Sequence, residues 1–528
     1  MDEGAPPVKT DAGLLSGVLG KNRAIRVYRG IPYAAPPVGN LRWRAPQPAP
    51  PWQGVREANA FGNNCMQPEI SPALVNADVA AGKKPRTLEF LAWRQPMSED
   101  CLYLNVWTPA NAANERLPVL FYVHGGAYDS GSGAVDIYDG EGLASKGLVV
   151  VTINYRLGIF GALAHPELSA ETEHTVSGNY GLLDQIAALE WVHRNISAFG
   201  GDPGNVTING YSAGAESVNY LLTTPLSRGL FARAIAESGG VFDPSEALLL
   251  RDAEEIGRRF AIEQKATGIS ELRAMPAADL IAGWLSSRAM SSTTRSVIFN
   301  QRIRRPIIDG YVLPSDAYTI FASGKQHDVP MIVGWASGDG TDNCRCSGFP
   351  DSAAEFPDAA RKQFGPMADE FLKAFPVTSD ADVPKIQAAF VRALWFANNS
   401  RTWARLQTKT GKSKIYLFYW DHLPPVSGAS KDFGAFHGSQ VVYALNTLDK
   451  WNLPWGSFDR RLADVMSSYW VNFAKTGNPN GPGLPLWPNF SPENEQSMHF
   501  AETIAWAPTP HKQELDFLDR WWSTRRSK

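Results

Sequence analysis

One pentapeptide constrains this chain more than any other feature: Gly210-Tyr-Ser-Ala-Gly214, which follows a β-branched run and precedes an apolar segment typical of a helix. Glycine at both ends removes the Cβ atoms that would block a sharp turn, so Ser212 can adopt a strained backbone conformation. Such a turn pushes the serine hydroxyl out of a sheet and places the N–H groups of a helix start beside it. The pentapeptide alone is a weak signal, so the rest of the chain must decide whether Ser212 is reactive.

Apolar runs alternate with helical patterns along most of the chain. Continuous apolar runs at 118–123 and 148–154 predict central strands that are buried on both faces. Further strands are expected at 98–107, 206–211, 232–237, 329–334 and 414–420, and helices at 182–195, 459–475 and near the C-terminus. This order predicts an α/β fold with a large, mostly parallel central sheet flanked by helices. Residues 243–325 are expected to form a helical insertion that covers a site. With no repeat and no convincing linker, residues 1–528 are expected to form a single domain.

Charge and cysteine content exclude several classes of protein. The net charge is −3 without a long run of one sign, so neither a nucleic acid nor an anionic membrane is an expected partner. No stretch approaches the roughly 20 uncharged apolar residues of a membrane-spanning helix, so no membrane anchor is expected. The N-terminus has neither the basic nor the apolar region of a signal peptide, although a leader could have been removed from a longer precursor. Four cysteines are too few for a disulfide scaffold or a zinc site, and no metal is expected.

A reactive serine needs a base, and the histidines after Ser212 are the candidates. A serine at such a strand–helix turn is expected to be followed along the chain by an acid and then by a histidine. The histidines that follow are His327, His422, His437, His499 and His511. His437 is favoured because glycines bracket its loop, which follows the strand expected at 414–420. His422 directly follows the same strand and stays open, whereas His327 is expected to be exposed to solvent.

Two aspartates compete for the role of the acid. Asp339 lies between two glycines just beyond the strand expected at 329–334, and Asp342 follows three residues later. Functional groups of α/β folds gather at the carboxyl ends of strands, which suits both residues. Spacing alone does not separate them, although the glycines give Asp339 the freer approach.

Backbone donors for an oxyanion are expected at two places. Gly125-Gly126-Ala127 follows a buried strand and precedes the serine turn, as expected for a glycine-rich donor loop. The N–H of Ala213, directly after the serine, would supply a further donor. No Gly-Lys-Ser/Thr follows the loop, which argues against a phosphate-binding role.

Several long motifs, in order, give the chain a specific resemblance over nearly its whole length. They are Gly30-Ile-Pro-Tyr-Ala-Ala-Pro-Pro-Val-Gly39, Glu99-Asp-Cys-Leu-Tyr-Leu-Asn-Val106, Gly178-Asn-Tyr-Gly-Leu-Leu-Asp-Gln185, the run from Phe199 to Gly214, and Trp470-Val-Asn-Phe-Ala-Lys-Thr-Gly-Asn-Pro-Asn480. The chain thereby resembles the type-B carboxylesterase and cholinesterase family of α/β-hydrolases. Its short loops and compact length are more similar to the bacterial para-nitrobenzyl-esterase branch than to the animal enzymes.

The resemblance implies roles for particular residues. It places the nucleophile at Ser212, the base at His437 and the acid at Asp339, and the oxyanion donors at Gly126, Ala127 and Ala213. It also implies a disulfide between Cys65 and Cys101 beside the active-site gorge, which favours a secreted or periplasmic protein over a cytoplasmic one. No family bridge corresponds to Cys344 and Cys346, which are free thiols or form a local bridge.

Four positions depart from the family pattern. Asp339 stands where the family usually has Glu, Tyr211 replaces the usual Glu before the nucleophile, Gln440 replaces a Glu after the histidine, and Ala127 replaces the third glycine of the oxyanion loop. Two of these changes, Tyr211 and Gln440, remove negative charge from the site. We therefore expect neutral or anionic esters to suit it better than cationic choline esters.

The resulting hypothesis is a serine carboxylesterase that acts on a small-molecule ester and needs no cofactor. The alternatives are a catalytically inactive adhesion or scaffold member of the family, and an amidase or thioesterase that uses the same residues. Some bacterial relatives remove polycarboxylate side chains from fungal toxins. Arg302, Arg304, Arg305 and Arg345 would favour such substrates if they faced the gorge, although solvated surface arginines are the simpler interpretation. The sequence leaves the natural substrate open, and both a monomer and a homodimer are compatible with it.

Overall fold

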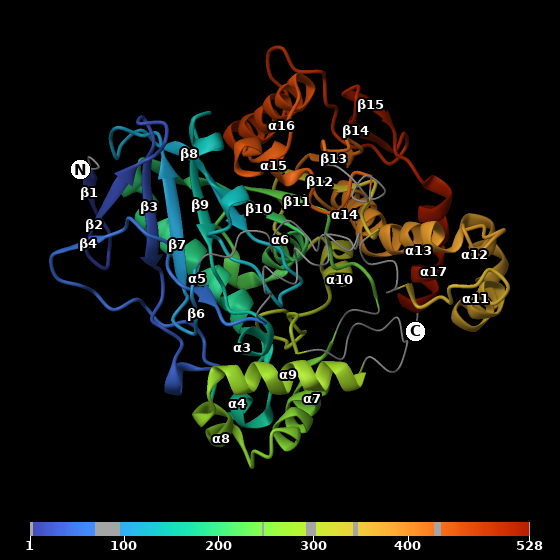
Figure 1. Ribbon diagram of the computed structural model, residues 1–528, viewed down its shortest axis with the longest axis horizontal. Coiled ribbons are helices and arrows are strands. Elements are labelled where there is room, and N and C mark those ends of the chain that lie inside the picture. The colour runs from blue at the N-terminus through green and yellow to red at the C-terminus, as the bar shows by residue number, and fades with distance from the viewer. Residues whose placement is uncertain are drawn as a thin grey trace.

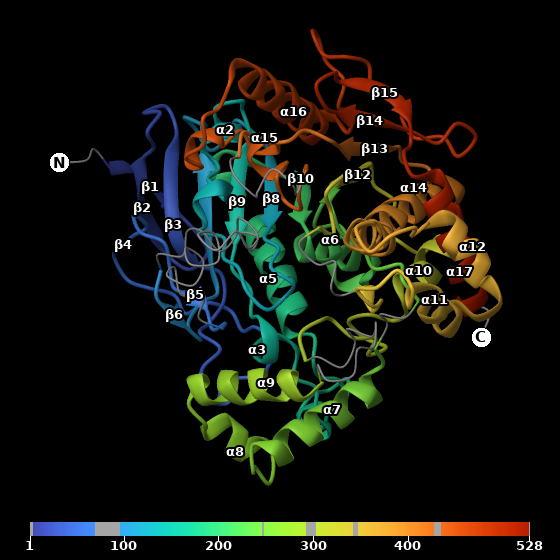
Figure 2. The same cartoon turned by 45° about the vertical axis from the view of Figure 1, so that its right-hand side comes forward.

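The computed structural model describes residues 4–68, 95–244, 248–291, 303–341, 347–426 and 434–526. Figure 1 and Figure 2 show one sheet that crosses the molecule, with the N-terminal strands at one end. Within the described residues this sheet has 13 strands. In spatial order they are β1 (Gly4–Lys9), β2 (Leu14–Leu19), β3 (Arg26–Pro32), β7 (Tyr103–Thr108), β9 (Val149–Ile153), β8 (Leu117–Val123), β10 (Gly201–Tyr211), β11 (Arg233–Glu237), β12 (Met331–Ala336), β13 (Ile415–Trp420), β14 (Gln496–Phe500) and β15 (Ala505–Pro508), while β4 (Val55–Glu57) pairs with β2.

The centre of the sheet is parallel and its ends are antiparallel, apart from β4, which runs parallel to β2. Every neighbouring pair from β9 to β14 is parallel, whereas β1, β2, β3 and β7 pair antiparallel with one another, β7 with β9, and β14 with β15. The predicted α/β fold with a mostly parallel sheet is therefore confirmed. The central strands begin and end within a few residues of the expected apolar runs, except that β10 begins five residues earlier than expected.

Alternate side chains of the central strands pack into two hydrophobic cores, one on each face of the sheet. Along β8, Val119, Phe121 and Val123 enter one core, and Leu120 and Tyr122 enter the other. Because successive residues of a strand point to opposite faces, a run that is apolar at every position must be covered on both sides. The helices that cover the first face are α5 (Tyr180–Asn195), α6 (Ala213–Thr223), α10 (Ala317–Ala322) and α14 (Asn398–Thr410). Those on the second face are α2 (Glu141–Ala144), α15 (Val441–Ala444) and α16 (Ser457–Thr476).

The expected helical insertion forms a separate layer beside the sheet, at the bottom of Figure 1. It contains α7 (Leu250–Glu263), α8 (Ile269–Ala274) and α9 (Ala277–Ser291), which pack with α3 (Gly158–Ala162) and α4 (Pro166–Ala170) around a third apolar cluster. Trp284 of α9 and Phe160 of α3 are both buried there. The insertion is therefore anchored to the helices that follow β9.

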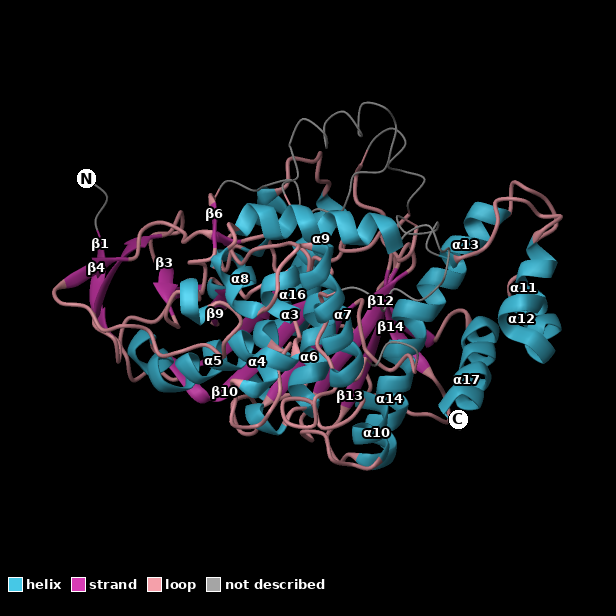
Figure 3. Cartoon of the chain, turned by 90° about the horizontal axis from the view of Figure 1, so that it is seen from below, coloured by secondary structure: helices cyan, strands magenta, loops and turns pink. Residues whose placement is uncertain are grey.

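The C-terminal helix is anchored at the opposite end of the sheet from the N-terminus. Figure 3 shows α17 (Lys512–Arg526) grouped with α11 (Phe356–Phe364), α12 (Ala368–Ala374) and α13 (Val383–Arg392). Stacked and edge-on phenylalanine rings, including Phe364, Phe371 and Phe517, fill the space between these helices. This end of the molecule is held by aromatic packing.

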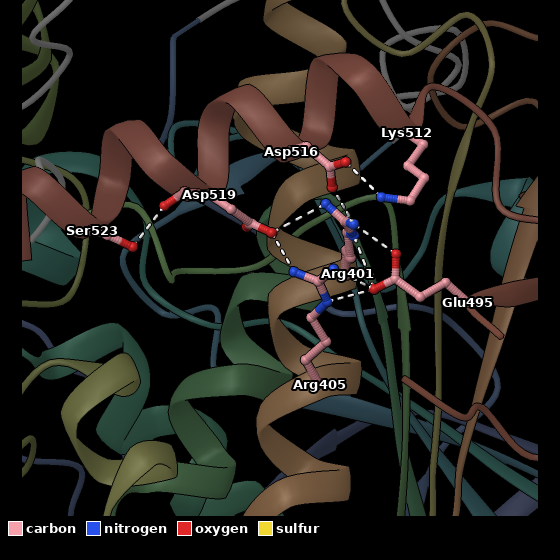
Figure 4. A network of polar contacts seen from close by, with 7 residues as sticks. All are labelled: Arg401, Arg405, Glu495, Lys512, Asp516, Asp519 and Ser523. Carbon is pink, nitrogen blue, oxygen red and sulfur yellow. Dashed lines mark hydrogen bonds and ion pairs between the residues drawn. The ribbon is translucent and has the colours of Figure 1, made fainter. Parts of the chain in front are cut away.

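Ion pairs add to this anchorage, as Figure 4 shows. The Arg401 guanidinium of α14 is almost fully buried and contacts Glu495 at 2.6 Å, Asp516 at 2.6 Å and Asp519 at 3.0 Å. Arg405 pairs with Glu495 and Asp519 as well. A guanidinium with several carboxylate partners keeps its charge compensated as it is buried, so the network fixes α17 against α14.

Among the described helices, none is both long and apolar enough to cross a membrane.

Candidate active site

The predicted sharp turn lies between β10 and α6, and its backbone explains both glycines. Ser212 has φ 57° and ψ −125°, a conformation that is strained for any residue other than glycine. A Cβ on Gly210 would lie 2.2 Å from the Gly214 carbonyl oxygen, and one on Gly214 would lie 2.1 Å from the Val123 carbonyl oxygen. The Ser212 N–H donates to the carbonyl of Glu237 on the neighbouring strand at 2.9 Å. The elbow is therefore locked to β8 and β11, and Ser212 stays partly accessible.

A hydrogen-bonded chain connects the three residues that the sequence singled out. The Nε2 atom of His437 lies 2.9 Å from Ser212 Oγ, and its Nδ1 atom lies 2.6 Å from Asp339 Oδ1. The other carboxylate oxygen of Asp339 accepts from the Ala336 N–H at 2.7 Å. Asp339 and His437 are both buried, at 1% and 5% exposure. With its carboxylate held at both oxygens, Asp339 can orient a neutral imidazole so that Nε2 accepts a proton from Ser212.

Two loops that are distant in the sequence are joined to make this contact. The N–H of Gly338 donates to the Ala435 carbonyl at 2.9 Å, and Gly338 forms an isolated parallel bridge with Phe436. The bridge places the residue after Gly338 beside the residue after Phe436. Asp339 and His437 are therefore held together by backbone geometry as well as by their side chains.

The competing candidates lie elsewhere or outside the described residues. His422 Nε2 contacts Asp459 at 2.8 Å, so this histidine belongs to a different pair at the start of α16. His327 is buried at 7% exposure, and its Nε2 lies 2.6 Å from the Thr224 carbonyl, so the expectation that it is exposed was wrong. The polar residues on either side of His327 suggested exposure, but the histidine packs between α6 and β12. Asp342 lies outside the described residues.

The glycine-rich loop after β8 has an unusual backbone. Gly126, Ala127 and Tyr128 have φ values of 107°, 55° and 59° in succession. The Gly126 carbonyl accepts hydrogen bonds from the Asp129 N–H at 3.0 Å and the Ser130 N–H at 3.1 Å, so the loop folds back on itself. Ala213 is the first residue of α6, where an N–H has no acceptor within the helix. A Cβ on Gly214 of the same helix would lie 2.1 Å from the Val123 carbonyl oxygen and 3.0 Å from that of His124, so the loop leaves β8 beside the elbow.

Two neighbouring arginines of the insertion contact this loop and the helix that follows the elbow. Arg304 is buried at 6% exposure, and its guanidinium lies 3.2 Å from Asp129 and 3.4 Å from the Ala127 carbonyl oxygen. Arg305 contacts Glu216, in the first turn of α6, at 3.0 Å. The interpretation as a solvated surface arginine was therefore wrong for Arg304, whereas Arg305 is half-buried in its ion pair. Arg302 and Arg345 lie outside the described residues.

The predicted disulfide between Cys65 and Cys101 is present, and both cysteines are buried. It joins the short strand β5 (Asn64–Cys65) to the segment that leads into β7. Cys344 and Cys346 lie outside the described residues. Within the described part of the chain, no cluster of His, Cys, Asp and Glu has the arrangement of a metal site.

A buried histidine supports the donor loop from behind. The ring of His124 stacks on Tyr155 at 4.4 Å between centroids, and its Nδ1 lies 2.7 Å from the Gly125 carbonyl. Burial lowers the pKa of His124 to about 4, so the ring is neutral at pH 7. The sequence contained His124 at the end of a buried strand, but nothing in its spacing distinguished a supporting role.

Glu237 is a buried carboxyl group below the elbow. Asn209 Nδ2 and Trp470 Nε1 lie 3.1 Å and 3.3 Å from its Oε1 atom. Burial raises the pKa of Glu237 to about 7, because desolvation outweighs these hydrogen bonds. The folded state therefore binds this proton more tightly than the unfolded state does, and stability falls as the pH rises from about 4.5 through 7.

Replacing Glu237 with glutamine should remove this pH dependence. At pH 8, where the wild-type carboxyl is charged, we expect the free energy of unfolding of Glu237→Gln to exceed that of the wild type by up to about 3 kcal/mol. Urea unfolding at pH 5 and pH 8 measures the difference, with the exposed Glu263→Gln as the control. A variant that is no more stable than the wild type at pH 8 would contradict a neutral, buried Glu237.

The elbow serine, its histidine and aspartate, and the donor loop after a central parallel strand together define the α/β-hydrolase class. Comparison with known proteins narrows the class. A model of the carboxylesterase family matches residues 4–518, and the chain belongs to this family. It is a carboxylic ester hydrolase.

Several relatives are similar over almost the whole chain. The fumonisin B1 esterase of Sphingopyxis macrogoltabida is 37% identical over 92% of this chain and 85% of its own length. The para-nitrobenzyl esterase of Bacillus subtilis is 32% identical over 97% of this chain and 98% of its own. A solved structure titled PNB esterase superposes with a TM-score of 0.80 at 29% identity, covering 97% of this chain and 99% of that one. The predicted resemblance to the bacterial para-nitrobenzyl-esterase branch is thereby confirmed.

Proposed function

We propose that this esterase works through an acyl-enzyme on Ser212, with His437 as the general base and Asp339 as the group that orients it. The observation that carries the proposal is the hydrogen-bonded chain from Ser212 Oγ through His437 to Asp339. A serine hydroxyl is a poor nucleophile unless an adjacent base takes its proton, and the 2.9 Å contact with Nε2 suits that transfer.

The reaction follows from this geometry in two halves. Ser212 Oγ attacks the ester carbonyl carbon while its proton moves to His437 Nε2. The resulting oxyanion would accept hydrogen bonds from the N–H groups of Gly126, Ala127 and Ala213. When the tetrahedral species collapses, the ester C–O bond breaks and the proton on Nε2 passes to the departing alcohol. Water, deprotonated by His437, then attacks the acyl-enzyme, releasing the carboxylic acid and returning the proton to Ser212.

The charges around the elbow support neutral esters as the substrate class. Tyr211 and Gln440, both buried, contribute no charge. The arginines that lie nearest the donor loop are each paired with a carboxylate, Arg304 with Asp129 and Arg305 with Glu216, so neither pair adds net charge. Without the two carboxylates that the family pattern has at 211 and 440, the site attracts a cationic alcohol group less strongly.

A panel of esters tests this substrate class. We expect kcat/KM for para-nitrophenyl acetate and butyrate to exceed that for acetylthiocholine and butyrylthiocholine by about 10-fold or more, which corresponds to roughly 1.4 kcal/mol of transition-state binding. Fumonisin B1 belongs in the panel because a relative 37% identical is named for its hydrolysis. A preference for the choline esters would overturn the proposed substrate class.

The buried disulfide also supports an oxidising compartment as the place of action. Such bridges persist in secreted and periplasmic proteins and are rare in reducing cytoplasm. We therefore propose that the protein is exported.

A further inference from the structure

We propose that Tyr211 and Phe396 are positioning residues that clamp the imidazole of His437 between them. This inference rests on the proposed function, because it concerns the histidine that acts as the base. The Tyr211 ring lies 4.8 Å from the imidazole, centroid to centroid, at an interplanar angle of 45°. The Phe396 ring lies 4.7 Å from it at 47°. Two aromatic rings thus contact the imidazole, in addition to its hydrogen bonds.

The two rings come from different parts of the fold. Tyr211 ends β10 and is 2% exposed, and it belongs to the hydrophobic core beneath α15 and α16. Phe396 lies in the π-helical turn η9 (Ala393–Ala397), is 7% exposed and belongs to the core on the other face of the sheet. Each ring is fixed by its own core. The two rings thus reach the imidazole from cores on opposite faces of the sheet.

The Tyr211 ring also packs against the main chain of Gly438, the residue that follows His437. Gly438 has φ +87°, and a Cβ at this position would lie 2.6 Å from the Tyr211 hydroxyl oxygen and 2.8 Å from Tyr211 Cζ. The tyrosine therefore lies against the backbone of the residue that follows His437, as well as against the imidazole. Glycine at 438 meets two requirements, the positive φ and the close approach of the ring.

The clamp supplies a restraint that the hydrogen bonds do not. Contacts at Nδ1 and Nε2 define a line through the imidazole, about which the ring can still tilt. Aromatic neighbours packed against the ring restrict that tilt. A small misplacement of a catalytic group can lower the rate by about 10²-fold. Tyr211 stands where the family usually has a glutamate, so this chain replaces a charged neighbour of the site with ring packing.

Leucine substitutions test the clamp through kcat rather than through binding. We expect Tyr211→Leu and Phe396→Leu each to lower kcat for para-nitrophenyl acetate by about 10- to 10²-fold with KM nearly unchanged. Tyr211→Phe, which keeps the ring and loses only the hydroxyl, should retain at least about a third of the wild-type kcat. The matched control is Tyr416→Leu, since Tyr416 is equally buried in the same core as Tyr211 but packs on Phe473 and Trp487. It should keep the wild-type kcat.

A double variant separates a clamp from two independent packing defects. If both rings hold one imidazole, freeing it from either side removes most of the restraint. Tyr211→Leu/Phe396→Leu should then lose less than the product of the two single losses. Wild-type kcat in both single variants, an equal loss in Tyr416→Leu, or multiplicative losses in the double variant would overturn the clamp. The proposed function would survive any of these outcomes, because Ser212→Ala tests it separately.

Discussion

Replacing Ser212 with alanine is expected to lower kcat for para-nitrophenyl acetate by on the order of 10⁵- to 10⁶-fold and to abolish the burst of para-nitrophenol. The hydroxyl is the atom that lies 2.9 Å from His437 Nε2, and alanine leaves no nucleophile at the elbow. The fold should be unaffected, because the hydrogen bond from the N–H of residue 212 to the Glu237 carbonyl does not involve the side chain. Stopped-flow measurement of the burst and steady-state turnover give both numbers.

The control for this experiment is a second serine on the elbow helix. Ser217 is fully buried in α6, and its hydroxyl lies 3.1 Å from Gln185 Nε2. Ser217→Ala removes a hydroxyl five residues further along and should keep the burst amplitude. A burst that persists in Ser212→Ala would mean that another residue is acylated.

Replacing Asp339 with asparagine is expected to lower kcat by about 10⁴-fold while the protein stays folded. The Ala336 N–H needs an acceptor, so the asparagine oxygen should take the position of Oδ2 and turn the amide NH₂ toward His437 Nδ1. Nδ1 must then accept a hydrogen bond, which forces the imidazole proton onto Nε2. In this tautomer Nε2 cannot accept the proton of Ser212.

A second histidine–aspartate pair among the described residues, with His422 half-buried and Asp459 buried, provides a matched control. Asp459 contacts His422 Nε2 at 2.8 Å, and its second oxygen accepts from the Gly456 N–H at 2.8 Å, as Asp339 does from Ala336. Asp459→Asn should leave kcat unchanged even if stability falls. A large loss of kcat in Asp459→Asn with none in Asp339→Asn would reverse the assignment of the acid and point to His422.

Local patterns were sufficient to predict the sheet and the serine. The central strands are apolar at every position because helices cover both faces, and that property is visible in a short window of sequence. The elbow was likewise predictable, since the close approach of Gly210 and Gly214 to neighbouring carbonyls permits only glycine. Burial on both faces and the lack of room for a Cβ each restrict the residue type at a single position, so they are visible in the sequence.

The choice between competing partners depended on contacts that no spacing encodes. Asp339 and His437 are 98 positions apart and meet because Gly338 bridges to Phe436. His422 was open from its position after β13, and only the contact with Asp459 shows that it serves another pair. The burial of His327 and Arg304, and the ring of Phe396 beside His437, also arise from segments distant in the chain. The sequence contained no signal for them.

Covalent labelling with a fluorophosphonate tests the central assignment most directly, because the reagent traps an activated serine as a stable adduct. Intact mass spectrometry and peptide mapping of the labelled wild-type protein should show one adduct, on Ser212. Labelling should be absent in Ser212→Ala and much slower in Asp339→Asn. An adduct on any other residue, or undiminished labelling of Ser212→Ala, would contradict Ser212 as the nucleophile.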